Sequence, residues 1–423
     1  MKRYKEYKDS GVKWIGEIPS HWDTKQFRRF FLIKKDVANC LGYDVLSVTQ
    51  KGLKVKDIES NEGQMANDYS KYQIVEVGDF VMNSMDLLTG YIDCARQKGV
   101  TSPDYKSFRV RQAISLNKDY YLYIFQLCYK GRIFYNLGRG VSNKGRWRLP
   151  SENLNRFMLP VPPLHEQQAI VDYLKDKTLK IEQYVSARER ERELLDSLKQ
   201  SEVANTVTKG LNPNVKMKDS GIPWIGEIPE HWIPCRNKDI FEESKKTVGE
   251  KSSDYVLLSL TKQGVIVRDL SENKGKFPKE FNTYKVVEPG DMIFCMFDVD
   301  ETPRTVGLSQ NFGMITGAYD VFKIKRVLPK FVLYYYLSID DRKALRPLYK
   351  GLRKVVPLPT FMSSKIFLPP LSEQQAIVAY IDEKLQKIDQ YMADLQREID
   401  YLKEFKQRLI SDAVTGQLCV IKQ

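Results

Sequence analysis

The sequence contains few of the residues on which metal-binding, disulfide-linked and membrane proteins depend. Its six cysteines lie far apart, without a CxxC pair, at Cys40, Cys94, Cys128, Cys235, Cys295 and Cys419. This spacing fits neither a zinc site nor a disulfide framework. The apolar run at 331–337 is far shorter than the roughly 20 residues that a membrane span needs. We therefore expect a cytoplasmic protein with reduced thiols, no metal site and no membrane partner.

Motifs of nucleotide and cofactor chemistry are also missing. The sequence has no GxxxxGK[ST] loop, no GxGxxG after a strand, and no Asn-Pro-Pro-aromatic motif of the kind found in amino-methyltransferases. Of the three histidines, His21 and His231 lie in a segment that occurs twice, and His165 is replaced by Ser372 in the second copy. A catalytic histidine is not expected to be lost from its own duplicate. We predict that this chain has no catalytic residue and holds no cofactor.

Composition instead favours a globular protein with an anionic partner. The 423 residues are 42% hydrophobic and include 24 glycines, which is enough for a packed core and for two to four domains. The 67 Lys and Arg exceed the 54 Asp and Glu, which leaves a net charge of +13 and a pI of about 9.2. A surplus of this size favours DNA, RNA or an acidic membrane surface.

The chain is an internal repeat. The segment KDSGVKWIGEIPSHW at 8–22 returns as KDSGIPWIGEIPEHW at 218–232, and PPLHEQQAIVDYLK at 162–175 returns as PPLSEQQAIVAYID at 369–382. The two offsets, 210 and 207 residues, are nearly equal, which chance does not produce. We interpret the four repeated tryptophans (Trp14, Trp22, Trp224 and Trp232) as packing anchors rather than as platforms for stacked bases.

Between the repeated ends the copies diverge but keep a common pattern. Segments 43–52 and 255–264, and segments 76–86 and 288–298, alternate or run apolar around glycine turns, which predicts strands. Aromatic residues recur at helical spacing over 120–137 and 331–349. The sequence therefore predicts an α+β protein with two mixed α/β domains that share a skeleton and differ on the surface.

A long helix is predicted after each Pro-Pro-Leu, from Glu166 to about Thr206 and from Glu373 to about Asp412. The second helix has an apolar heptad seam, formed by Val378, Ile381, Leu385, Ile388, Met392, Leu395, Ile399, Leu402 and Leu409. In the first helix, Arg188 and Arg192 interrupt the seam, and Leu194 and Leu198 offer a shifted stripe. We predict that the two helices pair as an antiparallel coiled coil, which relates the modules by a pseudo-two-fold axis.

This order of variable block, PPLxEQQAIV motif and long helix, repeated twice, resembles the specificity subunits of type I restriction–modification enzymes over essentially the whole chain. The predicted division is a first target-recognition domain at 1–160, a first long helix at 161–212, a second target-recognition domain at 213–368 and a second long helix at 369–423. The resemblance implies that each recognition domain reads one half of a bipartite double-stranded DNA target, while the helices set the spacing.

The same resemblance implies partners that carry the chemistry. The helices would dock two methyltransferase (modification) subunits, which use S-adenosylmethionine, and ATP-dependent restriction subunits would join the complex. S-adenosylmethionine, ATP and Mg²⁺ are therefore expected on partner subunits and not on this chain. We expect the helix starts, Glu166, Gln167, Gln168, Glu373, Gln374 and Gln375, to begin the helices and to share in this docking.

Candidate DNA contacts come from the chemistry of base edges, because Arg and Lys suit guanine, Asn and Gln suit adenine, and flanking cations suit phosphates. In the first domain the candidates are Gln50, Lys51, Arg139, Asn143, Lys144, Arg146 and Arg148. In the second they are Lys262, Gln263, Lys350, Arg353 and Lys354. An ordinary solvated charge is the competing interpretation of each residue, but as clusters they lie at equivalent places in both copies.

Two other functions compete with DNA specificity. A coiled-coil scaffold that binds only proteins would leave the basic surplus unexplained. A self-contained nuclease or methyltransferase would need a carboxylate cluster or a cofactor loop. Asp79, Asp86, Asp291 and Asp298 recur in both copies, but turns at the start of strands explain them more simply than a metal does.

Overall fold

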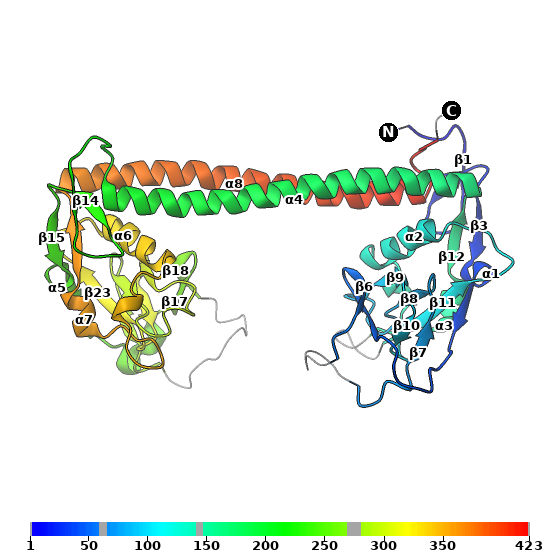
Figure 1. The fold of residues 1–423 in the computed structure, drawn as a ribbon, viewed down its shortest axis with the longest axis horizontal. Coiled ribbons are helices and arrows are strands. Elements are labelled where there is room, and N and C mark those ends of the chain that lie inside the picture. The colour runs from blue at the N-terminus through cyan, green and yellow to red at the C-terminus, as the bar shows by residue number, and fades with distance from the viewer. Residues whose placement is uncertain (1, 59–65, 141–146, 269–280, 422–423) are drawn as a thin grey trace. The chain divides into compact units, whose positions relative to one another are not determined.

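The computed structural model describes residues 2–58, 66–140, 147–268 and 281–421 (Figure 1). The chain divides into two compact units, residues 1–188 with 397–423, and residues 189–396. Each unit combines one α/β module with one half of each long helix. The first module precedes helix α4 (Leu164–Lys209), and the second lies between α4 and helix α8 (Leu371–Val414). The α+β class and the paired long helices that the sequence predicts are confirmed.

The first module is built from short antiparallel strands and short helices. Its strands are β1 (Tyr7–Asp9), β2 (Glu17–Pro19), β3 (Asp23–Gln26), β4 (Phe31–Lys34), β5 (Leu46–Thr49), β6 (Gly52–Val55), β7 (Gln73–Val75), β8 (Phe80–Met82), β9 (Ile92–Cys94), β10 (Gly99–Thr101), β11 (Lys106–Val110) and β12 (Met158–Val161). Its helices are α1 (Phe27–Phe30), α2 (Lys118–Lys130), the 3₁₀ helix η1 (Tyr135–Leu137) and α3 (Ser151–Arg156). A four-stranded sheet in the order β4-β11-β8-β9 forms its centre, and two-stranded pairs surround it.

The second module repeats this plan and adds one 3₁₀ helix, η2, before β17. Its strands are β13 (Met217–Asp219), β14 (Glu227–Pro229), β15 (Ile233–Arg236), β16 (Phe241–Glu243), β17 (Leu258–Thr261), β18 (Gly264–Val267), β19 (Lys285–Val287), β20 (Met292–Phe294), β21 (Val306–Leu308), β22 (Gly313–Ile315), β23 (Asp320–Ile324) and β24 (Lys365–Leu368). Its helices are α5 (Asn237–Ile240), η2 (Gly249–Asp254), α6 (Pro329–Asp341), η3 (Arg346–Leu348) and α7 (Leu358–Ser363). The central sheet order, β16-β23-β20-β21, matches that of the first module.

The aromatic segments form the predicted helices, but these end early. Helix α2 ends at Lys130 and α6 at Asp341, and each is followed by a turn and a 3₁₀ helix rather than by more α-helix. At these turns Arg132 and Lys343 adopt positive φ angles of 55° and 49°, a left-handed conformation that ends the helical run. The chain can thereby turn back toward the central sheet.

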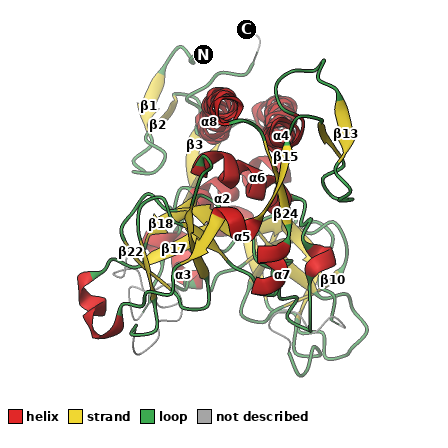
Figure 2. Ribbon diagram, turned by 90° about the vertical axis from the view of Figure 1, so that its left-hand side faces the viewer, coloured by secondary structure: helices red, strands yellow, loops and turns green. Residues whose placement is uncertain are grey.

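Each core lies between the central sheet, helix α2 or α6, and the long-helix pair. In the first unit, Phe31, Phe108 and Phe125 are fully buried, and their rings pack with centroids 5.4 to 5.5 Å apart. The same core extends to residues of both α4 and α8, such as Leu174 and Leu409. Figure 2 shows the second unit end-on, with α4 and α8 side by side and α6 beneath them. Burial of this aromatic cluster supplies the main hydrophobic stabilisation of each unit.

The two long helices run antiparallel within each unit (Figure 1). In the first unit, Tyr184 donates a 3.1 Å hydrogen bond to Glu398, while Lys406 pairs with the earlier Glu182. In the second unit, Lys199 lies 2.6 Å from Asp389, and Tyr380 donates to the later Glu202 at 2.7 Å. As residue numbers rise along one helix they fall along the other, so the predicted antiparallel pairing is confirmed.

The seam of α8 is the predicted one. None of its nine heptad residues is exposed, and Leu395, Ile399 and Leu409 are no more than 3% exposed. The shifted stripe suggested for α4 is wrong, because Leu194 and Leu198 are 63% and 52% exposed. The partly buried Arg188 and Arg192 occupy the α4 seam instead, where Arg188 pairs with Glu398 at 3.2 Å and Arg192 donates to Gln396.

Candidate nucleic-acid interface

The first pair of candidate clusters lies on tight turns at equivalent positions of the two modules. Gln50 and Lys51 form the turn between β5 and β6, and Lys262 and Gln263 form the turn between β17 and β18. All four side chains are exposed. Each turn closes on a glycine with φ near +100°, a conformation that other residues rarely adopt. The same backbone thus presents Gln-Lys in one module and Lys-Gln in the other.

The second pair of clusters lies on hairpin-like loops before α3 and α7. Arg139 and Arg148 bond to each other through their backbones at 2.9 and 3.1 Å, and Lys350 and Val355 do the same at 2.9 and 3.0 Å. Arg139, Arg148 and Lys350 are exposed. The other candidates of the first loop, Asn143, Lys144 and Arg146, lie outside the described residues.

One loop contacts both clusters in the first module. The Gln50 amide donates to the carbonyls of Thr89 and Gly90, and the backbone N–H of Leu149 donates to Ser84 at 2.9 Å. Residues 83–91, which join β8 to β9, therefore contact the β5–β6 turn and the backbone that follows Arg148. In the second module the equivalent residues 295–305 bond to the 350–355 loop, through Met296 to Val356 at 2.8 Å. In the first module the structure thus brings the two clusters to one end, and in the second it joins the β20–β21 loop to the 350–355 loop.

Two aspartates of the β20–β21 loop form ion pairs with basic candidates of the second module. Arg353 lies 2.9 Å from Asp298, and Lys354 lies 3.1 Å from Asp300. Hydrogen bonding and charge attraction from Asp298 raise the pKa of the Arg353 guanidinium. Burial acts to raise the pKa of Asp300, but hydrogen bonds from Lys354 and Arg346 outweigh it and lower that pKa. The recurring aspartates were noticed in the sequence, but only the structure shows which cation each one faces.

The helix-start residues join each module to its long helix. Glu166 is buried and accepts hydrogen bonds from Trp22 at 2.8 Å and Tyr4 at 3.0 Å. Gln167 is also buried and bonds to the backbone of Asn117 and Pro162. In the second module the half-buried Glu373 binds His231 and Trp232, and the buried Gln374 bonds to Leu328 and Pro369. Only Gln168 and Gln375 are exposed.

The tryptophans and two histidines have structural contacts. Trp22 and Trp232 are at most 1% exposed, and Trp14 stacks on Phe157 with ring centroids 5.3 Å apart. His21 contacts Glu166 at 2.6 Å, and His231 contacts Glu373 at 2.8 Å. These contacts hold the head of each module to its own helix start, so the interpretation of Trp22 and Trp232 as packing anchors is confirmed.

In the described parts of the chain, no group of three or more His, Cys, Asp or Glu side chains is arranged to hold a metal ion. Within the same ranges, no helix combines the length and the apolar character that crossing a membrane requires.

Comparison with known proteins shows which proteins this chain is similar to. Residues 27–187 match the family model described as the type I restriction modification DNA specificity domain. A protein of Methanocaldococcus jannaschii described as the specificity subunit of a type I restriction enzyme, MjaX, is 23% identical over 447 aligned positions. The alignment covers 98% of this chain and 98% of that relative.

Solved structures share the fold. The HsdS subunit from Thermoanaerobacter tengcongensis is 17% identical, with a TM-score of 0.50 over 95% of this chain and 98% of that one. A chain from a structure on complex assembly and conformational transition of the type I R-M system is 14% identical, with a TM-score of 0.66 over 95% of this chain and 99% of that one. The domain match over 27–187 and the full-length relative make the chain similar to type I restriction–modification specificity subunits, which its repeated motifs resemble, and the solved structures show a shared fold.

Proposed function

We propose that this chain is the non-catalytic DNA-specificity subunit of a type I restriction–modification complex, in which each module reads one half of a bipartite double-stranded target. The observation that carries the proposal is that two modules of one fold present different exposed polar side chains at equivalent turns. Gln50-Lys51 and Lys262-Gln263 illustrate this, because their donors and acceptors stand in opposite order on the same backbone. Such a difference suits two half-sites of different sequence.

The remaining candidates are proposed as contacts to the same DNA. Arg139, Arg148, Lys350 and Lys354 flank the turns and suit phosphate or base-edge contacts. The net charge of +13 supports binding to a polyanion. A scaffold that binds only proteins leaves both features without a role.

The experiment is selection of bound duplexes from a random DNA library, with the chain co-purified with its methyltransferase subunit. We expect two short, dissimilar motifs at a fixed spacing. Gln50→Ala with Lys51→Ala should change only one motif, and Lys262→Ala with Gln263→Ala only the other, by about 1–3 kcal/mol per affected base pair. Each double variant is the matched control of the other. Binding without a motif, which simply follows salt concentration, would support the scaffold instead.

We further propose that α4 and α8 set the number of unread base pairs between the half-sites. Inserting one heptad into each helix lengthens the pair by roughly 10 Å at 1.5 Å per residue. The selected motifs should then lie about three base pairs further apart, at 3.4 Å per base pair along one strand. An unchanged spacing would contradict this role.

Partner subunits carry the chemistry in this proposal. Two methyltransferase subunits, holding S-adenosylmethionine, would dock on the helices, with the exposed Gln168 and Gln375 as contacts. Restriction subunits would hold ATP and Mg²⁺, and the complex would act in the cytoplasm. Gln168→Ala with Gln375→Ala should weaken co-purification with the methyltransferase subunit. The other four helix-start residues have buried or half-buried side chains that bond within the chain. They remain docking candidates only through their effect on the helix starts: Glu166, Gln167, Glu373 and Gln374.

A further inference from the structure

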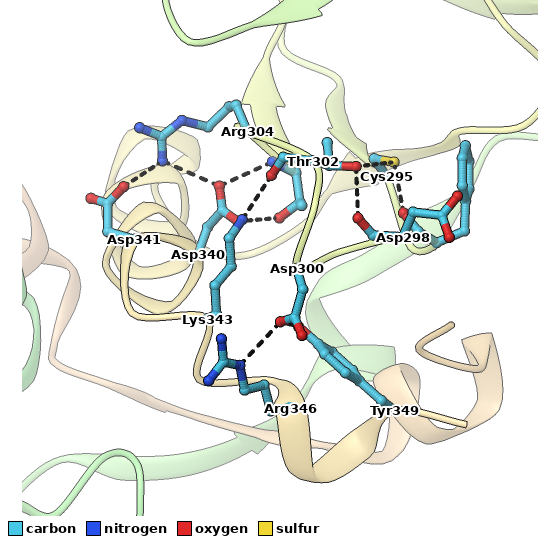
Figure 3. A network of polar contacts seen from close by, with 12 residues as sticks. Cys295, Asp298, Asp300, Thr302, Arg304, Asp340, Asp341, Lys343, Arg346 and Tyr349 are labelled. Atoms are coloured by element: carbon cyan, nitrogen blue, oxygen red, sulfur yellow. Dashed lines mark hydrogen bonds and ion pairs between the residues drawn. The ribbon is translucent and has the colours of Figure 1, made fainter. Parts of the chain in front are cut away.

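A buried carboxylate binds the C-terminal end of the loop that joins β20 to β21 in the second module. Asp340, near the end of α6, has a side chain only 3% exposed. It accepts hydrogen bonds from the backbone N–H and the hydroxyl of Thr305 at 3.0 and 2.7 Å. Arg304 and Lys343 pair with it at 3.2 and 2.7 Å (Figure 3). Four donors on one buried carboxylate fix the end of the loop, because leaving any of them unpaired there is costly.

The other part of this loop carries two aspartates that face the basic cluster. Asp298 adopts a left-handed conformation, with φ of 47°, and its carboxylate lies 2.9 Å from the guanidinium of Arg353. Asp300 has a side chain 18% exposed, lies 3.1 Å from Lys354 and accepts a 3.0 Å hydrogen bond from Arg346. Figure 3 shows Asp300 and Arg346 facing each other across the gap between their segments. The loop therefore holds two candidate readers through ion pairs.

Arg353 is held by two contacts besides its ion pair. Its guanidinium carbon lies 5.3 Å from the centroid of the Phe297 ring, within the range of a cation–π contact. Its backbone carbonyl accepts a 2.9 Å hydrogen bond from the N–H of Asp298. The side chain nevertheless remains 70% exposed. Arg353 is thus oriented by its neighbours and still accessible to DNA.

The first module uses the equivalent aspartate differently. Asp86 occupies the position of Asp298, but its carboxylate accepts hydrogen bonds from the backbone of Leu88 and Thr89, each at 2.9 Å. It thereby shapes its own loop. At the position of the buried Asp340, the first module has Tyr129, whose hydroxyl donates to Asn83 at 2.6 Å. Among the described residues, the buried carboxylate that anchors this loop occurs in the second module, where Tyr129 of the first module is replaced by Asp340.

Orientation matters more for a base contact than for a phosphate contact. Reading guanine requires the guanidinium plane to meet two acceptors at once, and a free side chain must lose rotamer entropy to do so. A neighbouring carboxylate also cancels one positive charge, which weakens non-specific attraction to phosphates. An arginine paired with an aspartate is therefore better suited to base readout than to backbone binding.

We propose that Asp298 and Phe297 are positioning residues that present Arg353 to a guanine in the second module's half-site, with Asp300 holding Lys354 beside it. This inference rests on the proposed function, since it assigns one residue of that site to direct base readout. The charged states of these groups support it, because the pKa of Arg353 is raised and that of Asp300 is lowered.

The test repeats the duplex selection, in complex with the methyltransferase subunit, for Asp298→Asn and Arg353→Lys. Asp298→Asn keeps the side-chain shape and removes the charge, and Arg353→Lys keeps the charge and removes the planar fork. Each should reduce the preference for one guanine in one half-site by roughly 10-fold or more. The other half-site should be unchanged, and the non-specific affinity of Asp298→Asn should be equal or higher. Asp86→Asn is the matched control and should leave that guanine preference intact.

Three results would overturn the inference. The first is a guanine preference that neither variant changes. The second is an equal loss of affinity at all target positions with a smaller salt dependence, which would make Arg353 a phosphate contact. The third is loss of both half-sites together with a lowered melting temperature in both variants, which would make the contact structural. Failure of the proposed function is distinguishable, because the unmodified complex would then select no motif at all.

Discussion

The two modules solve the same electrostatic problem in different ways. Each begins its central strand after a glycine turn that places an aspartate in the core, Asp79 in the first module and Asp291 in the second, both at most 4% exposed. Each carboxylate accepts a hydrogen bond from the backbone three residues earlier, at 3.0 and 2.8 Å. Asp79 is also paired with the buried Lys34 at 2.6 Å, whereas Ser244 stands at the equivalent position in the second module.

The buried aspartate therefore has a lysine partner in the first module, whereas in the second module a serine stands where that lysine would be. Burial raises the pKa of Asp291, and the backbone hydrogen bond and Lys323 offset only part of that effect. Because its folded-state pKa lies above the unfolded one, the native second module gains stability from this group at low pH. That gain is lost as pH rises through the folded-state pKa. The comparison teaches that the duplicated skeleton is preserved by its turn geometry, while the compensating charges are free to differ.

The largest expected difference between the modules follows from these aspartates. Asp79→Asn leaves the Lys34 ammonium buried without its closest partner and should lower the free energy of unfolding of the first unit by about 3–5 kcal/mol. Asp291→Asn removes a buried charge that is only partly compensated and should be neutral or slightly stabilising at pH 7. Urea unfolding of both variants measures this. An equal loss of unfolding free energy in the two variants would contradict this expected difference between the modules.

The coiled coil offers a second contrast, between the seams of its two helices. Leu395→Ala empties a site that is 3% exposed and should cost about 3 kcal/mol. Arg192→Ala removes a partly exposed polar contact on the facing helix and should cost about 1 kcal/mol or less. Far-UV circular dichroism during denaturation, compared between these variants, checks the order. A larger loss for Arg192→Ala would mean that the polar segment of α4 is the main source of pairing stability.

The smallest contrast concerns the junctions between module and helix. Glu166, with a side chain 5% exposed, binds Trp22, His21 and Tyr4, whereas the side chain of Glu373 is 26% exposed and binds His231 and Trp232. Glu166→Ala should therefore cost about 2 kcal/mol and Glu373→Ala about 1 kcal/mol, because unpaired donors cost more where water cannot reach them. Melting temperatures of the two variants test this ranking. A reversed order would show that the first junction relaxes to admit water.

Much of the fold was predictable because it rests on local patterns. The heptads of α8, the absence of Pro and Gly in its interior, and the repeated heads specify the long helices and the duplication without any knowledge of contacts. The turns that carry Gln50 and Lys262 were also recognisable, since alternating apolar residues and a glycine define a hairpin locally. The four-part division into domains and helices remains a prediction, and we retain it as our functional description of the chain.

Other features required the folded structure. The sequence placed Arg188 and Arg192 at seam positions of α4 but also offered a shifted stripe at Leu194 and Leu198. Only the folded structure decides between the two, because it shows that Glu398 faces Arg188. The sequence also did not reveal the acidic loop beside the basic cluster, since Asp298 and Arg353 are 55 residues apart. Ion pairs between distant segments leave no periodic trace in a sequence.

The duplication, the α+β class, the paired helices and the resemblance to a family follow from the sequence alone, because repeats and periodicity are properties of the chain as written. Only the tertiary structure decided which side of each junction is buried, which aspartate meets which cation, and which of the basic residues are held in place. The physical reason is that hydrophobic periodicity acts over a few neighbouring residues, whereas charge pairing depends on distances that exist only after the chain has folded.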